Sequence, residues 1–318
     1  APYGNSSTPC ATATSDTWYL ADGFTVDGST DQLILTNPFE HTVVADLRFT
    51  TKDGSRSPAR YSGLTVAPRS VRVIDLGAPG AGAQSEPLLA VSVHTSQGRL
   101  VVGRAQRFLG GGRLGGQVTL AQPALRDQWW FAGGQIGEGV TEEYVIYNPT
   151  DDDVQVDVVL VGIPTAVTVD PIEVPERGVA TFDPATVDGL GEGSYAAVFA
   201  TLAEPTVVVE RVTTQTVDDT VATTVIAGAT SRPGDGFYPT TWRVVQAPDE
   251  PTERALVIHN ADNADGTVTV YAIGSSGPVA VAGLTDIVLP AAQQVFVDLT
   301  DPLVAGRELI VETSHRVF

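Results

Sequence analysis

The sequence predicts an all-β protein made of three tandem immunoglobulin-like β-sandwich modules of about 110 residues each, the last of them truncated. The first observation behind this prediction is a repeat. The strand-like run Leu33–Asn37 recurs at Tyr144–Asn148 and at Leu256–Asn260, with spacings of 111 and 112 residues. The second is the lack of helical periodicity, since no long stretch places apolar residues at i, i+3, i+4 and i+7. The third is the density of Pro and Gly, which suits about seven or eight short strands per repeat.

Each repeat opens with aromatic residues and then reaches the asparagine that ends its first long strand. The openings are Trp18–Tyr19, Trp129–Phe131 and Phe237–Tyr238, with Trp242 close behind the last. Proline follows the asparagine in the first two repeats and restricts the residue before it to extended conformations. Because an Asn side chain readily bonds nearby backbone groups, we expect Asn37, Asn148 and Asn260 to end a strand and start a turn.

The next strand alternates apolar and polar residues. Within Val43–Phe49, every second side chain is apolar, and Asp46 and Arg48 lie on the opposite face. Matching stretches occur at Val154–Leu160 and Thr267–Ile273. We therefore expect one face of this strand to pack and the other to meet solvent.

A strand that begins after a proline and closes on an aspartate follows in every repeat, at Pro68–Asp75, Pro175–Asp183 and Pro290–Asp298. Two repeats then continue with a pair of apolar strands, Leu89–His94 with Leu100–Arg104 and Tyr195–Phe199 with Val207–Arg211. The third contains only Leu309–Thr313 and Val317–Phe318. We expect it to be short by roughly one strand and its return hairpin.

These landmarks divide the chain into four parts: residues 1–15, a linker or the end of a preceding segment, and repeats at 16–125, 126–235 and 236–318. A length of 318 residues suits two or three independent cores. A hydrophobic share of 42% with 18% charged residues is typical of a folded chain. The single cysteine, Cys10, is either a free surface thiol or the partner of a cysteine upstream.

The net charge of −20 argues against nucleic acid and against an anionic membrane surface as the partner. No stretch approaches the roughly 18 apolar residues of a membrane span, so no direct insertion is expected within these residues. Residues 1–10 lack the basic and apolar regions of a signal peptide. Any export signal or anchor is therefore expected outside this sequence.

Several of these motifs resemble known proteins. The opening Trp130–Gly134, the Asn-Pro strand end, the strand closing on Asp183 and the stretch Pro205–Arg211 are similar to an uncharacterised family of secreted or membrane-tethered actinobacterial proteins, a domain of unknown function. They also resemble bacterial surface repeats with Trp-Tyr-Phe-Ala-Glu-Gly-like openings and Val-Val-Glu-Arg strand ends. The resemblance covers nearly the whole chain. It implies an extracytoplasmic, repeated β-sandwich without catalytic residues. Ala261 in place of proline, and Gly103 in place of the Glu before Arg104, depart from the pattern.

No catalytic or cofactor motif stands out. The four histidines lack metal-ligand spacing, and no P-loop, nucleophile elbow or dinucleotide fingerprint occurs. We expect no cofactor and no enzyme activity, with a pair of carboxylates of the glycosidase kind as the alternative, since that chemistry needs only two acids about 5 to 10 Å apart. Four carboxylates in the turns that follow the Asn strand are candidate calcium ligands. Hydrogen bonds to the backbone of the turn are the stronger interpretation of these residues. They are Asp151, Asp153, Asp262 and Asp265.

Two further kinds of residue are singled out. Arg104 and Arg211 lie in apolar strands, so we expect each to form a salt bridge within its module, to an aspartate such as Asp75 or Asp183. The tryptophans are expected to pack the first strand of a module or a joint between modules. Because neighbours on a strand face opposite sides, whichever of Trp129 and Trp130 is exposed is the candidate binding residue.

We therefore expect a non-catalytic, exported binding or scaffolding protein of the bacterial cell envelope, whose partner is an envelope protein or a cell-wall glycan. One alternative is an ancillary carbohydrate-binding region of a larger glycan-active protein, and another is a hydrolase with an unrecognised acid pair. Exposed coplanar aromatic rings favour the first alternative, and a cleft with two close carboxylates favours the second. A tight joint between modules favours the scaffold, since the fold class alone does not choose among functions.

Overall fold

The computed structural model describes residues 6, 8, 10–162, 166–202, 204–218, 220–230, 240–244, 255–299 and 302–318. Within these residues the regular structure consists of strands β1 to β24 and three short 3₁₀ helices. The prediction of an all-β protein is confirmed, whereas the immunoglobulin-like topology stays a prediction. In the described ranges, no helix combines the length and the apolar character needed to cross a bilayer.

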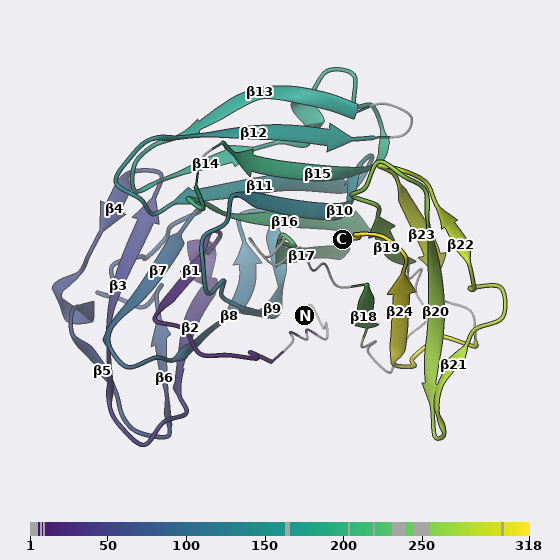
Figure 1. The fold of residues 1–318 in the computed structure, drawn as a ribbon. Coiled ribbons are helices and arrows are strands. Elements are labelled where there is room, and N and C mark those ends of the chain that lie inside the picture. Colours follow the sequence, from purple (N-terminus) through teal and green to yellow (C-terminus); the bar gives the residue numbers. More distant parts are fainter. Residues whose placement is uncertain are drawn as a thin grey trace.

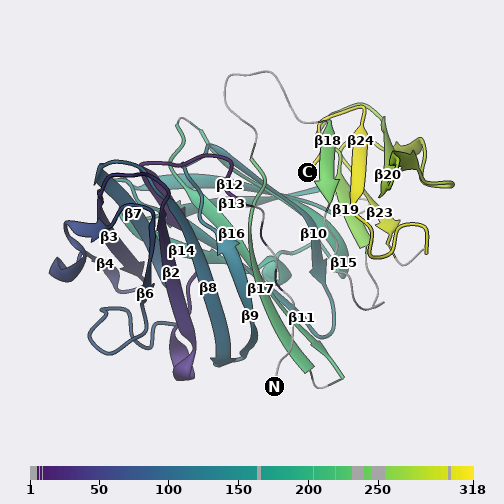
Figure 2. The same cartoon turned by 90° about the horizontal axis from the view of Figure 1, so that it is seen from below.

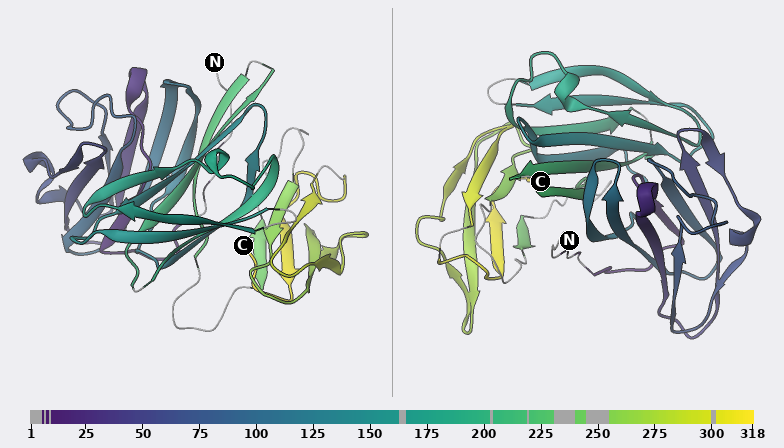
Figure 3. Two further views of the ribbon diagram at one scale, coloured as in Figure 1. Left: turned by 90° about the horizontal axis from the view of Figure 1, so that it is seen from above. Right: turned by 180° about the vertical axis from the view of Figure 1, so that it is seen from behind.

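The strands form three groups, which we call module 1 (β1–β9), module 2 (β10–β17) and module 3 (β18–β24). Figures 1 and 3 show the three modules along an arc, with module 2 in the middle. In Figure 2, the long strands β8, β9 and β17 lie next to one another where modules 1 and 2 meet. Packing between β9 and β17 therefore joins modules 1 and 2.

Module 1 is a sandwich of two sheets. The first sheet has the order β1-β7-β3-β4 with β5 beside β3, and its strands are β1 (Thr17–Leu20), β3 (Val43–Thr51), β4 (Gly54–Arg56), β5 (Leu64–Val66) and β7 (Ala90–Gln97). The second has the order β6-β2-β8-β9, with β2 (Thr30–Asn37), β6 (Ser70–Asp75), β8 (Val101–Gly110) and β9 (Arg113–Leu120). The connections contain η1 (Val26–Gly28) and η2 (Ala59–Tyr61). Alternate side chains of β2 and β3 enter the core between the sheets.

Module 2 repeats this plan. Its first sheet has the order β10-β15-β12-β13, with β10 (Gln128–Ile136), β12 (Val154–Val161), β13 (Ala166–Val174) and β15 (Gly193–Thr201). Its second has the order β14-β11-β16-β17, with β11 (Val140–Asn148), β14 (Gly178–Phe182), β16 (Val208–Val217) and β17 (Thr220–Ala227). The 3₁₀ helix η3 (Pro184–Thr186) follows β14. All five core residues Tyr144–Asn148 at the end of β11 are buried, because both faces of this strand are covered.

Module 3 has a complete first sheet and a smaller second one. The first has the order β18-β24-β20-β21 with β22 beside β20, and its strands are β18 (Thr241–Val244), β20 (Gly266–Gly274), β21 (Gly277–Ala280), β22 (Ile287–Leu289) and β24 (Leu309–Thr313). The second consists of β19 (Ala255–His259) and β23 (Gln294–Asp298). The aromatic opening Phe237–Tyr238 and the expected start of the third repeat at residue 236 lie outside the described residues.

The repeated asparagines make the same set of hydrogen bonds in every module. Nδ2 of Asn148 donates to the backbone carbonyls of Asp152 (2.8 Å), Val174 (3.2 Å) and Pro175 (3.0 Å), and its Oδ1 accepts from the backbone N–H of Thr150 (3.0 Å). Corresponding bonds surround Asn37 and Asn260. One side chain thereby ties a strand end, its turn and the proline-led segment together, so the observed role of these residues is structural.

The first strand of each module carries a tryptophan in an equivalent register. Trp18 lies opposite Val93, Trp129 opposite Phe199, and Trp242 opposite Val311. Nε1 of Trp18 donates to the carbonyl of Leu100, and Nε1 of Trp129 donates to the carbonyl of Val207, both over 3.0 Å. The buried Nε1 of Trp242 has no acceptor in the described part of the chain. Among the described residues, module 3 therefore lacks a contact that modules 1 and 2 share.

Candidate functional site

Modules 1 and 2 share a hydrophobic core across their joint. Ala21, Phe24, Ala90 and Phe108 of module 1 belong to the same buried cluster as the core of module 2. The ring of Phe24 packs against Phe108 with centroids 5.9 Å apart. Burial of apolar surface on both sides of the joint opposes hinge motion, because opening it exposes that surface to water.

A buried charged cluster lies within this joint. Glu210, on β16 of module 2, is only 1% exposed, and its Oε2 accepts the backbone N–H groups of Ala21 (3.0 Å) and Asp22 (2.7 Å). Nη2 of Arg104, on β8 of module 1, lies 3.6 Å from the same oxygen and is equally buried. The carboxylate of module 2 is thus held by a cation and two amide dipoles of module 1.

Asp31 is the third member of this cluster. It is 1% exposed, and neither of its carboxylate oxygens has a hydrogen-bond partner among the described residues. Burial raises the pKa of Asp31 to about 7, and the nearby charge of Arg104 opposes that rise. A second ion pair, between Nη1 of Arg113 and the buried Asp22 (3.0 Å), lies next to it and also brings Arg113 within 3.5 Å of Glu143 in module 2.

Strands β9 and β17 complete the joint. The side chain of Gln117 on β9 accepts the backbone N–H of Val225 on β17 (2.7 Å) and donates to the carbonyl of the same residue (3.2 Å). A glutamine amide can imitate a backbone pair in this way because it carries one donor and one acceptor side by side. These two hydrogen bonds therefore join the side chain of β9 to the backbone of β17 across the joint.

The joint between modules 2 and 3 is built from fewer contacts. The indole of Trp130 stacks on the ring of Phe318, with centroids 4.8 Å apart and nearly parallel planes. The backbone N–H of Gly133 donates to Oε1 of Gln294 (3.1 Å), whose Nε2 donates to the hydroxyl of Ser194 (2.7 Å). A Cβ at position 133 would lie 3.1 Å from a methyl of Val257 at a positive φ of 67°, which makes glycine the fitting residue there.

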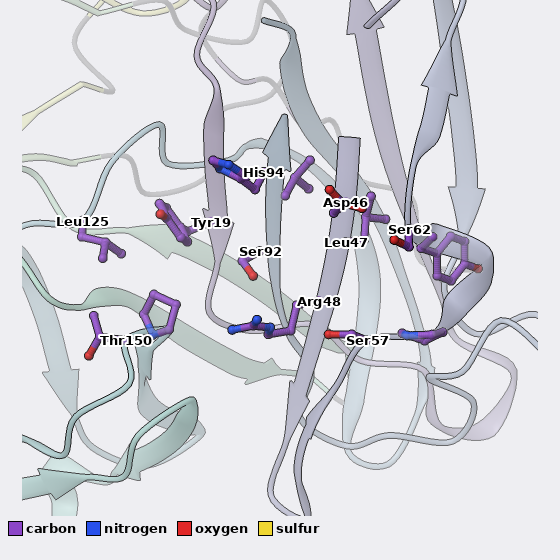
Figure 4. Close-up of a pocket in the computed structure, with 14 residues that line it drawn as sticks. Tyr19, Asp46, Leu47, Arg48, Ser57, Ser62, Ser92, His94, Leu125 and Thr150 are labelled. Atoms are coloured by element: carbon purple, nitrogen blue, oxygen red, sulfur yellow. The ribbon is translucent and has the colours of Figure 1, made fainter. Parts of the chain in front are cut away.

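A groove of about 570 Å³ runs along the module 1 to module 2 joint. Its floor is the outer face of the first sheet of module 1, from which Tyr19, Asp46, Arg48, Ser92 and His94 project. Its far wall consists of Leu125, from the segment between the modules, and Pro149 and Thr150 of module 2. Figure 4 shows Arg48 directed toward the turn that carries Thr150, with Tyr19 and His94 above it.

The strand alternation explains why these side chains line the groove. Ala45, Leu47 and Phe49 of β3 are buried in the core, whereas Asp46 and Arg48 face outward, as the sequence predicts. Oδ1 of Asp46 accepts the backbone N–H of Gly63 (2.8 Å), so this carboxylate is already engaged. Among the described residues that line the groove, Asp46 carries the one carboxylate. The lining offers a cation, an imidazole and hydroxyl groups, which suits recognition of a polar or anionic surface.

The tryptophans do not form an exposed platform. Trp129 is 0% exposed, so the binding role considered for it is wrong, because its ring lies in the core of module 2. Trp130 is half-buried and covered on one side by Phe318. The two rings do face opposite sides of β10, as a period of two requires, but the outward ring meets module 3 instead of solvent.

The expected arginine pairing is only partly correct. Arg104 pairs with Glu210 of the neighbouring module, so the prediction of a bridge within its own module is wrong. Arg211 does pair within module 2, with Oε1 of Glu142 (3.8 Å), and donates to the carbonyl of Ala132 (3.1 Å). The aspartates named as partners, Asp75 and Asp183, instead accept backbone N–H groups in the turns that follow them. Asp298 ends β23 and lies opposite Ala255.

Each of the calcium candidates is engaged by another group of the protein. Asp151 pairs with Arg177 (2.6 Å) and Asp262 with Arg316 (2.7 Å). Asp153 and Asp265 each accept a backbone N–H, from Glu176 (2.8 Å) and Ala291 (2.9 Å). In the parts of the chain that the structure describes, no three acidic, histidine or cysteine side chains gather as a metal site would require. The sole cysteine, Cys10, has an exposed thiol.

Glu210 and Asp31 are the joint residues that sequence reasoning missed. A signal existed for Glu210, since the second repeat has Glu before its arginine where the first has Gly103. Position 210 faces module 1, whose Arg104 and backbone amides bind the carboxylate. For Asp31 the signal is its phase, since residues 31, 33 and 35 share one face of β2, and Leu33 and Leu35 are buried in the core.

Comparisons with known proteins agree with a repeated chain. A family of unknown function, DUF5719, matches residues 3–231 and again residues 110–308, so one match spans modules 1 and 2 and the other modules 2 and 3. No curated protein matches the chain. Among solved structures, the chain is similar to the crystal structure of Thermotoga maritima 1070, with 14% identity, a TM-score of 0.30, and coverage of 33% of this chain and 93% of that one. The family matches together cover nearly all of the sequence, and the chain belongs to the DUF5719 family of unknown function.

Proposed function

We propose that this protein is a non-catalytic binding or scaffolding protein of the bacterial cell envelope, which presents a fixed pair of modules to a partner protein. The observation that carries the proposal is the joint between modules 1 and 2, in which Glu210 binds Arg104 and two backbone amides of the other module. A protein whose modules serve only as loose spacers has no need of a shared core and a buried interdomain ion pair.

The groove supports the same proposal. Its floor belongs to module 1 and its far wall to module 2, so its width depends on the joint being closed. A polar lining with Arg48 and His94 suits an acidic or hydroxyl-rich partner surface. Among the described residues that line the groove, Asp46 carries the one carboxylate, and it already accepts the backbone N–H of Gly63. This lining does not favour hydrolysis by an acid pair, which needs two acids about 5 to 10 Å apart.

The placement in the envelope rests on the resemblance of Trp130–Gly134 and Pro205–Arg211 to bacterial surface repeats. Carbohydrate binding is the second candidate, and Tyr19 and Tyr61 in the groove lining are the aromatic residues that favour it. The two candidates share one site and differ in the partner, so one experiment separates them.

The test is a pull-down from the envelope fraction of the producing cell with the purified full chain, analysed by mass spectrometry, beside a sedimentation assay with insoluble peptidoglycan. The groove variant is Arg48→Glu, which reverses the charge that faces module 2. The matched control is Arg99→Glu, at an exposed position between β7 and β8 outside the groove.

A specific protein that is retained by the wild type and by Arg99→Glu, and lost with Arg48→Glu, supports the scaffold. Retention on peptidoglycan that is lost with Tyr19→Ala moves the assignment to glycan binding. Equal retention of every partner by all variants contradicts a function of this groove.

A further inference from the structure

The buried charges in the joint between modules 1 and 2 do not balance. Three of its carboxyl groups are each only 1% exposed, those of Asp22, Asp31 and Glu210. The guanidinium groups that pair with this cluster belong to Arg104 and Arg113. With all five groups ionised, three negative charges face two positive ones. Because an uncompensated charge is costly in a buried site, uptake of one proton by a carboxylate makes the cluster neutral.

Hydrogen bonding indicates which carboxyl group holds the proton. Glu210 accepts two backbone N–H groups, and Asp22 pairs with Arg113 over 3.0 Å. Neither carboxylate oxygen of Asp31 has a hydrogen-bond donor among the described residues. Donors stabilise the ionised form of a carboxyl group, so the group that lacks them is the first to bind a proton.

Charged groups reach Asp31 from four elements. Arg104 on β8 favours its ionised form. Three carboxylates disfavour it: that of Asp22 after β1, that of Glu210 on β16 and that of Asp75 on β6. Burial has the largest effect and raises the pKa of Asp31 to about 7. Because Arg104 also lies 3.6 Å from Glu210, its charge is shared between two carboxyl groups.

Module 2 contains the same position with its donors in place. Glu142 and Asp31 both lie six residues before the asparagine of their repeat, and both are buried. Glu142 accepts hydrogen bonds from the hydroxyl groups of Tyr195 (2.6 Å) and Thr213 (3.1 Å). It also accepts the backbone N–H of Gln135 (3.2 Å). Equivalent carboxyl groups of the two modules therefore differ in whether donors surround them.

Two differences between the repeats remove these donors from module 1. Leu89 stands where module 2 has Tyr195, since each lies four residues before the residue that pairs with the tryptophan of its module. Gln106 pairs with Asp31 as Thr213 pairs with Glu142, and its amide donates to two backbone carbonyls instead. The lack of donors around Asp31 thus follows from these two residues of module 1.

We propose that Asp31 is a proton-binding site that controls the joint between modules 1 and 2, so that the joint is tight while this carboxyl group is protonated and loosens when the proton leaves. Ionised Asp31 competes with Glu210 for Arg104 and repels the carboxylate that crosses from module 2. The closed joint binds the proton more tightly than a hydrated carboxylate does. The stabilisation is therefore present at acidic pH and is lost as the pH rises through about 7.

The groove between the modules follows the joint. Its floor belongs to module 1 and its far wall to module 2, so a looser joint changes the distance between them. Binding of a partner in this groove should weaken as the pH rises. This consequence rests on the proposed function, whereas the proton site itself does not.

The test is amide hydrogen exchange of the full chain at pH 5 and pH 8, corrected for the intrinsic exchange rates. The amides of Ala21 and Asp22 report on the joint, because they donate to Glu210 across it. We expect at least about tenfold greater protection of both at pH 5, since proton release on opening makes the opening equilibrium depend on pH. The Gly133 amide, which donates to Gln294 across the other joint, is the internal control and should gain no protection at pH 5.

Asp31→Asn is the matched variant, because an amide keeps the shape of the side chain and stays neutral at both pH values. We expect its Ala21 and Asp22 amides to have the same protection at pH 5 and pH 8. The infrared difference spectrum of wild type against this variant should contain the C=O stretch of a protonated carboxyl group at pH 5 and lose it at pH 8. Equal protection of the wild-type amides at both pH values overturns the proposal, as does a pH dependence that Asp31→Asn retains.

A second measurement separates the groove from the joint. Retention of the partner found in the pull-down is compared at pH 5 and pH 8. Stronger retention at pH 5 by the wild type, and equal retention by Asp31→Asn, supports the link between the proton and the groove. Equal retention by the wild type, with amide protection changing as expected, overturns that link and leaves the proton site supported.

Discussion

The carboxylate of Glu210 in module 2 lies 3.6 Å from the guanidinium of Arg104 in module 1 and also accepts two backbone N–H groups from the same module. Four polar groups of two modules thus converge at one buried point. Removing a single partner leaves the other charge buried and uncompensated, which is far more costly than replacing both.

Glu210→Gln should therefore weaken the joint. The amide oxygen can still accept from Ala21 and Asp22, but Arg104 loses the carboxylate that forms its salt bridge. We expect the free energy of unfolding to fall by on the order of 3 kcal/mol, the low end for one broken buried pair. Urea denaturation measures this loss, and small-angle X-ray scattering reports whether the arc opens. The double variant Arg104→Met with Glu210→Gln is the control, and it should recover most of the lost stability. Equal loss in both variants would show that the pair itself is unimportant.

Arg211→Ala should destabilise module 2. Arg211 is buried, lies 3.8 Å from Glu142 and donates to the carbonyl of Ala132. Without it, the contacts that Glu142 keeps among the described residues are with hydroxyl groups and with the backbone of Gln135. We expect a loss of about 3 to 5 kcal/mol, measured by thermal and urea unfolding. The exposed Arg99→Ala is the matched control and should leave the melting temperature unchanged. An unchanged melting temperature for Arg211→Ala would contradict a structural role for the pair.

Asn148→Ala should cost about 1 to 3 kcal/mol, because it leaves carbonyl groups of the turn and of Val174 without their donor. Asn148→Asp is the sharper variant, since a carboxylate keeps the shape and cannot donate to those carbonyls. We expect the order of stability to be wild type, then Ala, then Asp, in chemical denaturation at pH 7. The same order is expected at Asn37 and Asn260. Greater stability of the Asp variant than of the Ala variant would contradict the donor role.

Because of Asp31, the stability of the joint should decrease as the pH rises. Its folded pKa of about 7 lies above the ordinary value of 3.8, so the folded state binds a proton more tightly than the unfolded chain. This stabilisation is fully present below pH 3.8 and is lost as the pH rises through about 7. This pKa shift corresponds to roughly 4 kcal/mol of unfolding free energy. Asp31→Asn should lack this dependence, so unfolding free energies at pH 5 and pH 8 should diverge between wild type and variant. Parallel pH profiles would refute the assignment.

His259 should make the stability of module 3 decrease as the pH falls, which is the opposite of the effect of Asp31. Burial lowers the pKa of its imidazole to about 4, from 6.5 in the unfolded chain. The stabilisation that comes from the neutral imidazole is fully present above pH 6.5 and is lost as the pH falls through about 4. The full pKa shift corresponds to roughly 3 kcal/mol of unfolding free energy. His259→Gln should flatten the loss of module 3 stability between pH 7 and pH 4. Hydrogen exchange of β20 and β24 amides reports on this module separately from the others.

Much of the fold follows from local pattern. The alternation in Val43–Phe49 places Asp46 and Arg48 on the outer face of β3, and the structure has them there. The three asparagines are predicted to end strands and start turns, and they bond the turn backbone in all three modules. Such features depend on residues close in sequence, on a two-residue period and on side-chain bonds to nearby backbone, so a single sequence contains the information.

The joints depend on contacts that no local pattern records. Arg104 was expected to pair within its own module, yet its partner Glu210 is 106 residues away in the next one. Trp130 was a binding candidate because strand neighbours face opposite sides, and the side it faces is covered by Phe318 of module 3. The sequence by itself determined the all-β architecture, the repeat and the role of its asparagines. Only the tertiary structure decided which charges are buried and which faces are covered, because burial and electrostatic pairing depend on how whole sheets pack.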